Sequence, residues 1–445
     1  MKAGILSHES AALTGWVQPV LGPADFDRLI DQAGNAQVVL IGEASHGTED
    51  FYATRASLTR RLIEEKGFRV LALEADWPDM LRVHRYVTGR AAEPNAAAAL
   101  GDFRRFPAWM WRNTVMVEFV EWLRGWNLQP GGTVRSAGIF GMDLYSLHAS
   151  MASVLAYLDN VDPAAAGRAR RRYACFEHFG QDPQVYGYAT TLGRAESCES
   201  AVVDQLVELR RNYGELLGRE GQLAEDEFFY AEQNARLVKN AENYYRSMFR
   251  GRDESWNLRD QHMAETLAAL LGHFDGGQSK MVVWAHNSHL GDARATEMSR
   301  RGEWNLGQLV RERLGRRSFA IGFSTYSGTV TAARDWGAPA ERRHVRPALE
   351  GSYEALFHAS QTPQFWLDLR ADNDATKVLR QPRLQRAIGV IYRPESERLS
   401  HYFEACLPDQ FDALIHCDIT HALEPLERSS EWDRAELPET YPEGF

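Results

Sequence analysis

Four short apolar segments, separated by stretches of helical periodicity, constrain the fold of this chain more than any other feature. They are rich in β-branched residues and apolar on both faces, as expected for strands covered on both sides of a sheet. These segments are residues 36–42, 68–75, 134–143 and 280–287. Helical patterns follow at residues 48–66, 78–88, 114–127 and 147–159. The alternation predicts an α/β fold with a mostly parallel or mixed central sheet flanked by helices.

Further strands are predicted in the second half of the chain, and a long central block has a different pattern. Short apolar runs predict these strands at residues 317–324, 364–369, 387–392 and 412–417. Residues 160–275 are instead rich in Arg, Glu, Ala, Leu and Tyr, with apolar residues at helical spacing. We therefore predict a single domain over residues 1–445, with an α/β core at 1–150 and 276–445 and a mainly helical insertion at 151–275.

Charge and composition exclude several classes of protein. The net charge of the 445 residues is −11, whereas a general affinity for nucleic acid or an anionic membrane needs a basic surface. No apolar run approaches the roughly 20 residues of a membrane-spanning helix, and the N-terminus lacks the apolar core of a signal peptide. The four cysteines include no CxxC pair, which predicts reduced thiols. We expect a cytoplasmic protein, and the sequence sets no oligomeric state.

Polar residues follow each of the four early strands at the point where it ends. The carboxyl ends of parallel strands form one edge of a sheet, where ligands bind in open α/β folds, so residues far apart in the sequence are expected to meet there. These residues are Glu43 and His46 after the first strand, Glu74 and Asp76 at the second, Asp143 at the third, and His286 and His289 after the fourth. The sequence therefore predicts a cleft lined by carboxylates and imidazoles.

Each of these residues, taken alone, also suits an ordinary structural role. Glu43 suits a helix cap, Glu74 a salt bridge to an arginine, and His289 a loop. Arg55 lies nine residues past His46, about two turns into the following helix. It is predicted to reach back as a carboxylate clamp or anion stabiliser, with an exposed helical arginine as the alternative.

The motifs that are absent narrow the chemistry. The sequence has no GxSxG turn for a nucleophilic serine, no GxGxxG after a strand and no P-loop. Direct attack by water remains, with an imidazole as base, a carboxylate to fix its tautomer, and a cation or hydrogen-bond donor to stabilise the oxyanion. His46 with Glu43 or Glu74 supplies the base. The predicted donors are Arg55, His286 and His289.

A bound metal is the alternative interpretation of the same residues. Histidine and glutamate side chains from several strand ends suit zinc or manganese, with one position left open for water. The HExxH spacing is absent. We predict that no cofactor is needed and keep a divalent metal as the alternative.

At these motifs the sequence resembles the erythromycin esterase family. The resemblance is carried by "IGEASHGTEDFYATRASLTRRLI", "LALEADWPDMLRVHRYV", "RFPAWMWRN", "SWNLRDQHMAETL", "VVWAHNSHLGDAR" and "NLGQLVRERLG". It implies a metal-independent ester hydrolase with an α/β core and added helices, in which His46 is the general base that activates water for attack on a macrolide lactone. It also implies that the other motif residues surround His46. They are Glu43, Glu74, Arg55, His286 and His289.

The resemblance leaves the substrate open. A more distant similarity to metal-using proteins with a Gly-x-x-x-His start, here Gly42 to His46, keeps the metal alternative in view. Trp77 and Asp143 are predicted to contact the substrate, whereas Trp109 and Trp111 are expected to pack beneath their loop, with lining of the cleft as the alternative. We predict a hydrolase of a carboxylic ester or macrolide-type lactone. The alternatives are a metal-dependent hydrolase of another bond and a non-catalytic protein that binds a small molecule.

Overall fold

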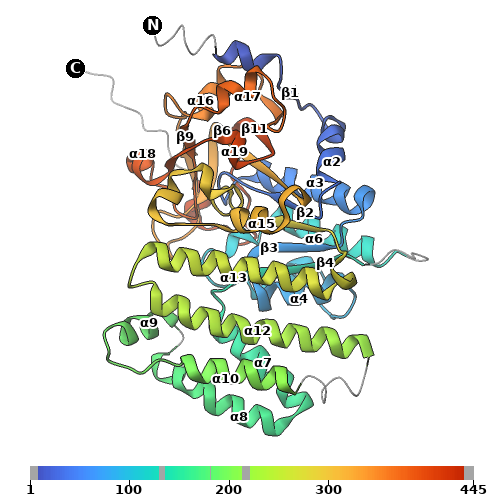
Figure 1. Ribbon diagram of the computed structural model, residues 1–445, viewed down its shortest axis with the longest axis vertical. Coiled ribbons are helices and arrows are strands. Elements are labelled where there is room, and N and C mark those ends of the chain that lie inside the picture. The colour runs from blue at the N-terminus through green and yellow to red at the C-terminus, as the bar shows by residue number, and fades with distance from the viewer. Residues whose placement is uncertain (1–8, 130–135, 181, 213–220, 435–445) are drawn as a thin grey trace.

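One mixed sheet organises the fold. The computed structural model describes residues 9–129, 136–180, 182–212 and 221–434, and within them nine strands form this sheet (Figure 1). Their order is β1-β8-β11-β6-β2-β5-β3-β4, with β7 paired to β6 beside this path. The strands are β1 (Gln18–Pro19), β2 (Val38–Ile41), β3 (Val70–Asp76), β4 (Gly138–Asp143), β5 (Met281–Trp284), β6 (Ser318–Ala332), β7 (Glu341–Val345), β8 (Gln364–Asp368) and β11 (Ala413–Thr420). The predicted α/β class is confirmed.

Parallel pairing fills the centre of the sheet. β5 lies between β2 and β3 and is parallel to both, with Val39 and Leu71 each opposite Val282. β2 is also parallel to β6, and β3 is parallel to β4. Beyond β6, β11 continues parallel, whereas β8 runs antiparallel to β11. The carboxyl ends of the four early strands, β2 to β5, therefore share one edge of the sheet.

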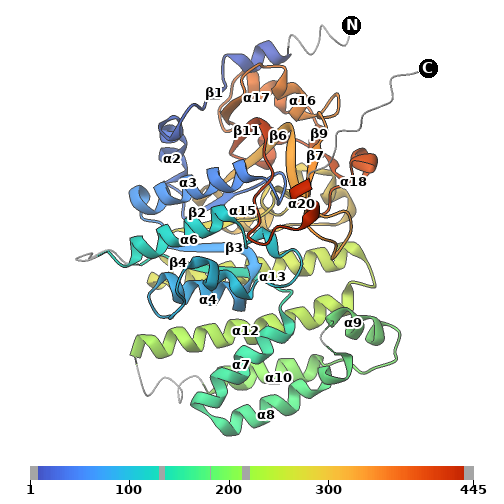
Figure 2. The same cartoon turned by 180° about the vertical axis from the view of Figure 1, so that it is seen from behind.

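Helices cover both faces of this sheet (Figures 1 and 2), which explains why its central strands are apolar throughout. One face is covered by α2 (Asp27–Ala33), α3 (Glu49–Lys66) and α6 (Thr114–Asn127), and the other by α13 (Arg252–His273) and α15 (Leu306–Leu314). Alternate residues of β2 belong to the two cores. Val39 and Ile41 pack with the first set of helices, and Val38 and Leu40 with the second.

The central block of the chain is helical in its described residues. It contains α7 (Leu147–Val161), α8 (Pro163–Tyr173), α9 (Pro183–Thr191), α10 (Glu199–Arg211), α12 (Gly221–Ser247) and α13. Figure 1 shows α13 between the sheet and the other helices of the block. One hydrophobic cluster continues from Phe140 of β4 to Leu237 of α12, and the division of the chain into core and insertion stays a prediction. None of the described helices is long and apolar enough to span a membrane.

One predicted strand is wrong. Residues 387–392 form no strand, and the strands beside them are β9 (Arg383–Arg386) and β10 (Tyr402–Ala405), which pair with each other in a separate sheet. Ile388 makes only an isolated bridge to the loop after β2. The apolar run is explained by burial in a small cluster rather than by a ladder of hydrogen bonds. This cluster contains Val330, Ala332, Val345, Ile388 and Tyr392.

The third predicted strand differs at its start. β4 begins at Gly138, and residues 134 and 135 of the predicted range lie outside the described residues. The prediction of four reduced cysteines also needs correction. Cys175 and Cys198 form a disulfide with a Cα–Cα distance of 6.0 Å, and Cys406 and Cys417 are free. The packing of the helical block brings this pair together, and their separation of 23 residues carries no motif that predicts it.

The contact between α15 and the short helix α14 (Asn287–Leu290) depends on a glycine. A Cβ atom at Gly307 would lie 2.0 Å from the carbonyl oxygen of Leu290. Asn305, the N-cap of α15, donates to the carbonyl oxygen of Ser288 at 2.7 Å. Because α14 carries His289, these contacts fix the loop after β5 against α15.

Gly307→Ala should destabilise the protein by about 2 kcal/mol or more, because the added methyl group must displace backbone rather than a flexible side chain. Thermal unfolding of the variant and the wild type measures this loss. Gly272→Ala is the matched control, since Gly272 is exposed on α13 and its Cβ would meet nothing within 4 Å. The control should be neutral or stabilising by about 0.5–1 kcal/mol. A Gly307→Ala protein as stable as the wild type would contradict the close contact.

Candidate active site

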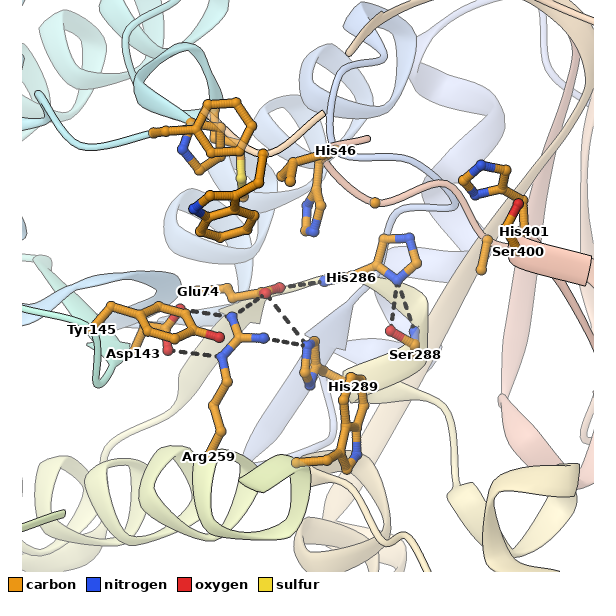
Figure 3. A pocket seen from close by; sticks show the side chains of 18 of the residues that line it. His46, Glu74, Asp143, Tyr145, Arg259, His286, Ser288, His289, Ser400 and His401 are labelled. Atoms are coloured by element: carbon orange, nitrogen blue, oxygen red, sulfur yellow. Dashed lines mark hydrogen bonds and ion pairs between the residues drawn. The ribbon is translucent and has the colours of Figure 1, made fainter. Parts of the chain in front are cut away.

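A cleft of about 700 Å³ opens at the carboxyl edge of the sheet (Figure 3). Other segments of the chain complete the wall of the cleft. They include residues 103–111, 297–303 and 387–403. The structure brings six of the strand-end residues predicted from the sequence to this cleft. They are His46 after β2, Glu74 and Asp76 in β3, Asp143 at the end of β4, and His286 and His289 after β5. Asp76 accepts hydrogen bonds from Arg105 there.

His46 is held by Glu43. The Nδ1 atom of His46 lies 2.9 Å from Oε1 of Glu43, and Oε2 of Glu43 lies 2.8 Å from the guanidinium of Arg55. The ion pair with Arg55 requires a carboxylate at Glu43, and a carboxylate only accepts hydrogen bonds. Nδ1 of His46 therefore carries a proton, and in the neutral ring Nε2 carries the lone pair. The ring points into the cleft (Figure 3).

Arg55 lies beneath the cleft rather than in it. Its side chain is fully buried, with the guanidinium 4.2 Å from the ring centre of Tyr52 and 4.9 Å from that of Trp284. Glu43 is the acidic partner that the described residues give it. Neither Arg55 nor Glu43 lines the cleft. Of the two predicted roles of Arg55, its position agrees with the carboxylate clamp and contradicts direct stabilisation of an anion in the cleft.

His286 is fixed as a hydrogen-bond donor. Its Nδ1 accepts the backbone N–H of Ser288 at 3.2 Å and lies 2.8 Å from Oγ of Ser288. The proton of the neutral ring therefore lies on Nε2, an atom that is buried and interacts with the carbonyl group of Ala44. Burial and the nearby His46 lower the pKa of His286 to about 3, against smaller contrary effects of Glu74 and of the Ala44 carbonyl. The ring centres of His286 and His46 are 4.9 Å apart.

A guanidinium from α13 joins the carboxylates of β3 and β4. Arg259 donates to Oε1 of Glu74 at 2.7 Å and to the two oxygens of Asp143 at 2.9 and 2.7 Å (Figure 3). The other oxygen of Glu74 accepts the backbone N–H of His286 at 2.9 Å. Burial raises the pKa of Glu74. The charges of His289, Arg259 and His46 together lower it by more, so that the net pKa lies well below its usual value. Glu43, rather than Glu74, is the hydrogen-bond partner of His46.

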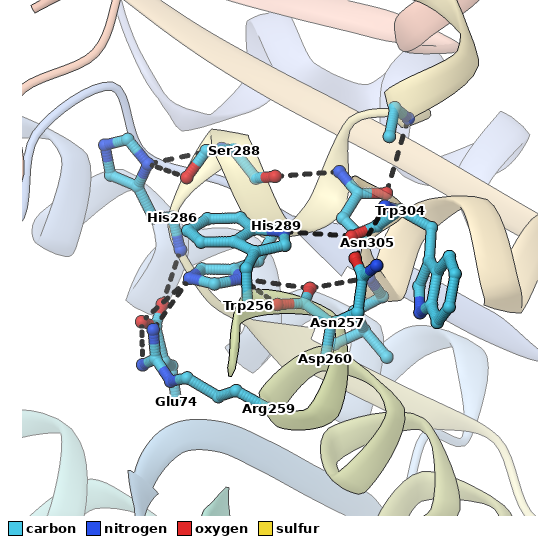
Figure 4. A network of polar contacts seen from close by, with 12 residues as sticks. Glu74, Trp256, Asn257, Arg259, Asp260, His286, Ser288, His289, Trp304 and Asn305 are labelled. Atoms are coloured by element: carbon cyan, nitrogen blue, oxygen red, sulfur yellow. Dashed lines mark hydrogen bonds and ion pairs between the residues drawn. The ribbon is translucent and has the colours of Figure 1, made fainter. Parts of the chain in front are cut away.

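His289 is enclosed by side chains of one helical turn (Figure 4). Its Nδ1 lies 2.9 and 3.0 Å from the oxygens of Asp260, and its Nε2 lies 3.0 Å from the guanidinium of Arg259. Trp256 stacks on the ring, with centres 4.5 Å apart. Burial and Arg259 lower the pKa of His289, but Asp260 and Glu74 raise it more, so the net pKa lies above its ordinary value.

Comparison with known proteins identifies the relatives of this chain. The sequence profile of the erythromycin esterase family matches residues 63–420. The chain belongs to the erythromycin esterase family. The resemblance predicted from the motifs is confirmed, and the family supports a hydrolase as the class of enzyme.

Individual relatives agree with this family and with the fold. The chain is 23% identical over 410 residues to YbfO, a Bacillus subtilis protein to which hydrolase activity is ascribed, covering 85% of this chain and 82% of that protein. A Bacillus cereus protein has a similar structure, with a TM-score of 0.78, 20% identity, and coverage of 95% of this chain and 99% of that chain. A mutant of the erythromycin esterase EreC in its open conformation has a TM-score of 0.67 and 20% identity, covering 93% of this chain and 98% of that chain.

A succinoglycan biosynthesis protein shares the same fold. Its structure has a TM-score of 0.75 and 20% identity, and the match covers 95% of this chain and 99% of that chain. At this level of identity, the structural matches establish the fold alone. A shared fold does not determine the reaction, which depends on the side chains of the cleft.

The predicted position of Trp77 in the cleft is wrong. Its indole is buried and stacks on Phe140 of β4, with ring centres 5.7 Å apart. As the first residue of α4 (Trp77–Val87), it packs between β4 and α12, where it also meets Phe229. Asp143 does line the cleft, but both its oxygens accept hydrogen bonds from Arg259. Its predicted contact with substrate stays a prediction.

The two other tryptophans have different positions. Trp109 is buried away from the cleft, as expected, whereas Trp111 lines it. Tyr145 also lines the cleft, and the guanidinium groups of Arg105 and Arg259 each lie 4.9 Å from its ring centre. No strand-end pattern predicted Tyr145.

The residues of α13 are the main omission of the sequence analysis. Trp256, Arg259 and Asp260 lie in the motif "SWNLRDQHM", at helical spacings of three and four. That spacing puts them on one side of a helix, and a buried side with two charged residues is a signal for a polar partner. The sequence could not name the partner, because the position of α13 over the sheet edge is a matter of packing.

A metal site is not formed by the arrangement of these side chains. Across the described ranges, no group of three or more His, Cys, Asp or Glu residues is placed to hold a metal ion. The Nδ1 atoms of His46 and His289 face Glu43 and Asp260. The predictions of no cofactor and of a metal as the alternative both stay predictions.

Glu43→Ala should destabilise the protein by about 3–5 kcal/mol, because it leaves the buried guanidinium of Arg55 without its acidic partner. Denaturant unfolding measures this change. The double variant Glu43→Ala/Arg55→Met removes the stranded charge and should recover most of the lost stability while the His46 ring loses its support. A double variant no more stable than Glu43→Ala would show that Arg55 gains nothing from Glu43.

Proposed function

We propose that this protein hydrolyses a carboxylic ester, open-chain or lactone, by attack of a water molecule that His46 activates. The observation that carries the proposal is the buried Glu43–His46 pair, whose remaining imidazole nitrogen faces a cleft that contains hydrogen-bond donors. Membership of the erythromycin esterase family supports the same reaction class. The proposed reaction needs no cofactor.

His46 is the general base. Its Nε2 takes a proton from water while the water oxygen attacks the ester carbonyl carbon, and Glu43 then stabilises the imidazolium that forms. Arg55 balances the buried charge of Glu43 and keeps the carboxylate in place. A general base of this kind contributes about 10²- to 10⁴-fold to the rate.

His286 is the proposed donor to the oxyanion. The ring is neutral at neutral pH and carries its proton on Nε2, so it donates a hydrogen bond without readily losing the proton. Its position next to His46 suits a carbonyl oxygen whose carbon is attacked by water on His46. His286 thus takes the part of the oxyanion role that was predicted for Arg55. We assign protonation of the leaving alkoxide to His289, the other histidine of the loop after β5.

The same geometry argues against a covalent serine. Oγ of Ser288 lies 2.8 Å from Nδ1 of His286, but a ring with a pKa of about 3 is too weak a base to activate a hydroxyl at neutral pH. Ser45 is buried and its hydroxyl is bonded to that of Thr48. Direct attack by water remains the better account of the side chains present.

The mouth of the cleft supports a bulky, partly apolar substrate. Trp336 is 58% exposed and Leu399 is 89% exposed, and both line the cleft. Trp336 packs edge-on against Phe106, and Met110 and Trp111 continue the apolar wall. Large apolar side chains left exposed at a cleft are typical of ligand contacts. We therefore propose macrolide-type lactones and other bulky esters as the substrate class. The cytoplasm stays our proposal for the location, although the Cys175–Cys198 disulfide does not support it.

His46→Ala should lower kcat/KM by about 10²-fold or more while the protein stays folded, because water then lacks its base. The measurement is a panel of macrolide lactones, simple lactones and esters, incubated in ¹⁸O-labelled water with and without a chelator. Mass spectrometry should detect one added water, with one labelled oxygen in the carboxylate product.

Three results would count against the proposal. A His46→Ala protein that keeps more than about a tenth of the wild-type rate would remove His46 from the role of base. Activity lost together with a stoichiometric metal on chelation would favour the metal-dependent alternative. A wild-type protein that binds members of the panel, turns over none of them and keeps its affinity on His46→Ala substitution would be a binding protein.

Trp336→Ala should raise KM for a bulky lactone on the order of 10-fold, the effect of losing one apolar contact, with kcat little changed. The KM for a small ester such as ethyl acetate should change less than about twofold, since a small ester does not reach the rim. Trp16→Ala is the matched control, because Trp16 is 46% exposed and does not line the cleft. Equal kinetics of Trp336→Ala and wild type on bulky substrates would remove Trp336 from the substrate contact.

A further inference from the structure

We propose that Asp260 and Arg259 are positioning residues that make His289 the acid of the reaction. The cleft then contains two carboxylate–histidine pairs with opposite tasks: Glu43–His46 takes a proton from water, and Asp260–His289 gives one to the leaving alkoxide. This inference rests on the proposed function and assigns a task in it to one turn of α13.

Asp260 is placed to fix the tautomer of His289. It is fully buried, and its carboxylate accepts the backbone N–H of Leu306 at 2.7 Å as well as the N–H at Nδ1 of His289. Burial raises the pKa of Asp260, whereas His289, Arg259 and the backbone N–H of Leu306 at the N-terminus of α15 act in the opposite direction and favour the carboxylate. Nδ1 of His289 therefore stays protonated, and Nε2 is the atom that gains and loses the transferable proton.

Both protonation states of Nε2 have a partner in place. When Nε2 carries a proton, Oε1 of Glu74 lies 3.5 Å away to stabilise the positive ring. When the proton has left, the lone pair of Nε2 accepts a hydrogen bond from Arg259 at 3.0 Å. The guanidinium of Arg259 stays in place when the proton leaves, because its other nitrogens donate to Asp143 and Glu74 at 2.7–2.9 Å. Because Arg259 donates to the lone pair of Nε2, protonation of Nε2 breaks this hydrogen bond, and Arg259 favours release of the proton from His289.

The remaining side chains of the turn hold the ring in position. Trp256 lies parallel to the imidazole, and its Nε1–H donates to the carbonyl oxygen of Trp304 at 2.9 Å (Figure 4). Asn257 accepts the backbone N–H of Trp304 and donates to the carbonyl oxygen of Gly302. The ring is therefore fixed by stacking and by two hydrogen-bonded nitrogens, as a proton donor of defined direction requires.

The proposed step balances as follows. In the tetrahedral intermediate the carbon–alkoxide bond breaks, and its electron pair goes to the leaving oxygen. The proton on Nε2 of His289 forms the new O–H bond of the alcohol, and the carbonyl group of the acid is restored. His46 then returns the proton that it took from water to solvent, and His289 takes one from solvent. The net reaction is ester plus water to acid plus alcohol.

The charges around His289 determine how the reaction depends on pH. The groups that face it are Asp260 and Arg259 of α13, Glu74 of β3, and His286 of its own loop. As an acid, His289 must be protonated, so activity falls as pH rises through its pKa. Removing the charge of Asp260 lowers that pKa, and the alkaline limb of kcat/KM should move to lower pH by about one unit or more.

Asp260→Asn tests the inference with two esters of one acid, ethyl butyrate and 4-nitrophenyl butyrate. An alkoxide leaves only with a proton, whereas 4-nitrophenolate leaves without one, so the ethyl ester should lose about 10-fold or more in kcat beyond the loss for the aryl ester. Asp260→Glu keeps the carboxylate and should restore part of the selective loss. Asp226→Asn is the matched control, since Asp226 and His273 form a pair at 3.0 Å outside the cleft, and it should leave both the ester ratio and the alkaline limb unchanged.

Equal losses for the two esters with an unmoved alkaline limb would overturn the inference and leave Asp260 a structural residue. If Asp260→Asn does not fold, His289→Gln replaces it and should show the same selective loss of the ethyl ester. A second readout does not need activity. In ¹⁵N-histidine NMR spectra, the signals that vanish in His289→Gln should report protonated Nδ1 and a pKa that falls in Asp260→Asn.

The two readouts separate the possible failures. An unchanged His289 titration in Asp260→Asn overturns the inference whether or not an ester is hydrolysed. A shifted titration in a protein that hydrolyses no ester of the panel would support the positioning of His289 by Asp260 and reject the proposed function instead.

Discussion

The carboxylate of Glu43, shared between Arg55 and His46, is the interaction on which the rest of the site depends. A buried charge is tolerated only when it is paired and hydrogen-bonded, and the other carboxylates of the cleft follow the same arrangement. Glu74 is held by a backbone N–H and by Arg259, and Asp260 by a backbone N–H and by His289. The groups that pair with the buried charges are therefore the same groups that set the protonation of the histidines. A substitution among them is expected to change both the stability of the protein and the chemistry of the site.

The sheet and the position of the cleft could be predicted because they follow from local patterns. Period and composition identify the four early strands, and topology alone brings their carboxyl ends to one edge, where His46, Glu74, Asp143, His286 and His289 lie. What depends on packing could not be predicted. The position of α13, the inward turn of Trp77 and the pairing of Cys175 with Cys198 are set by contacts between distant segments. Residues 387–392 show that a buried loop can have the same apolar sequence pattern as a β-strand without forming the hydrogen bonds of a sheet.

The cleft is assembled from two kinds of segment with different constraints. Its polar centre comes from strand ends and from one turn of α13, where every charge is bonded to another element. Its rim comes from residues 103–111 and from segments after β6, where Trp336 and Leu399 are exposed and carry no charge. Substitutions at the rim leave the buried network intact, whereas a change at the centre leaves a charge unpaired. Substrate preference can therefore diverge between related proteins faster than the reaction.

Because β5 lies between β2 and β3, the central sheet cannot form fully until β5 has been synthesised. β2 and β3 end at residues 41 and 76, but the strand that joins them begins at residue 281. At roughly 5–20 residues per second, a ribosome takes about 10–40 s to make the intervening chain. Throughout that interval both apolar strands have an open edge, which is a template for pairing with another chain. Helices α3, α4 and α6, which emerge before β5, cover part of this surface, and their early packing protects the nascent sheet from aggregation.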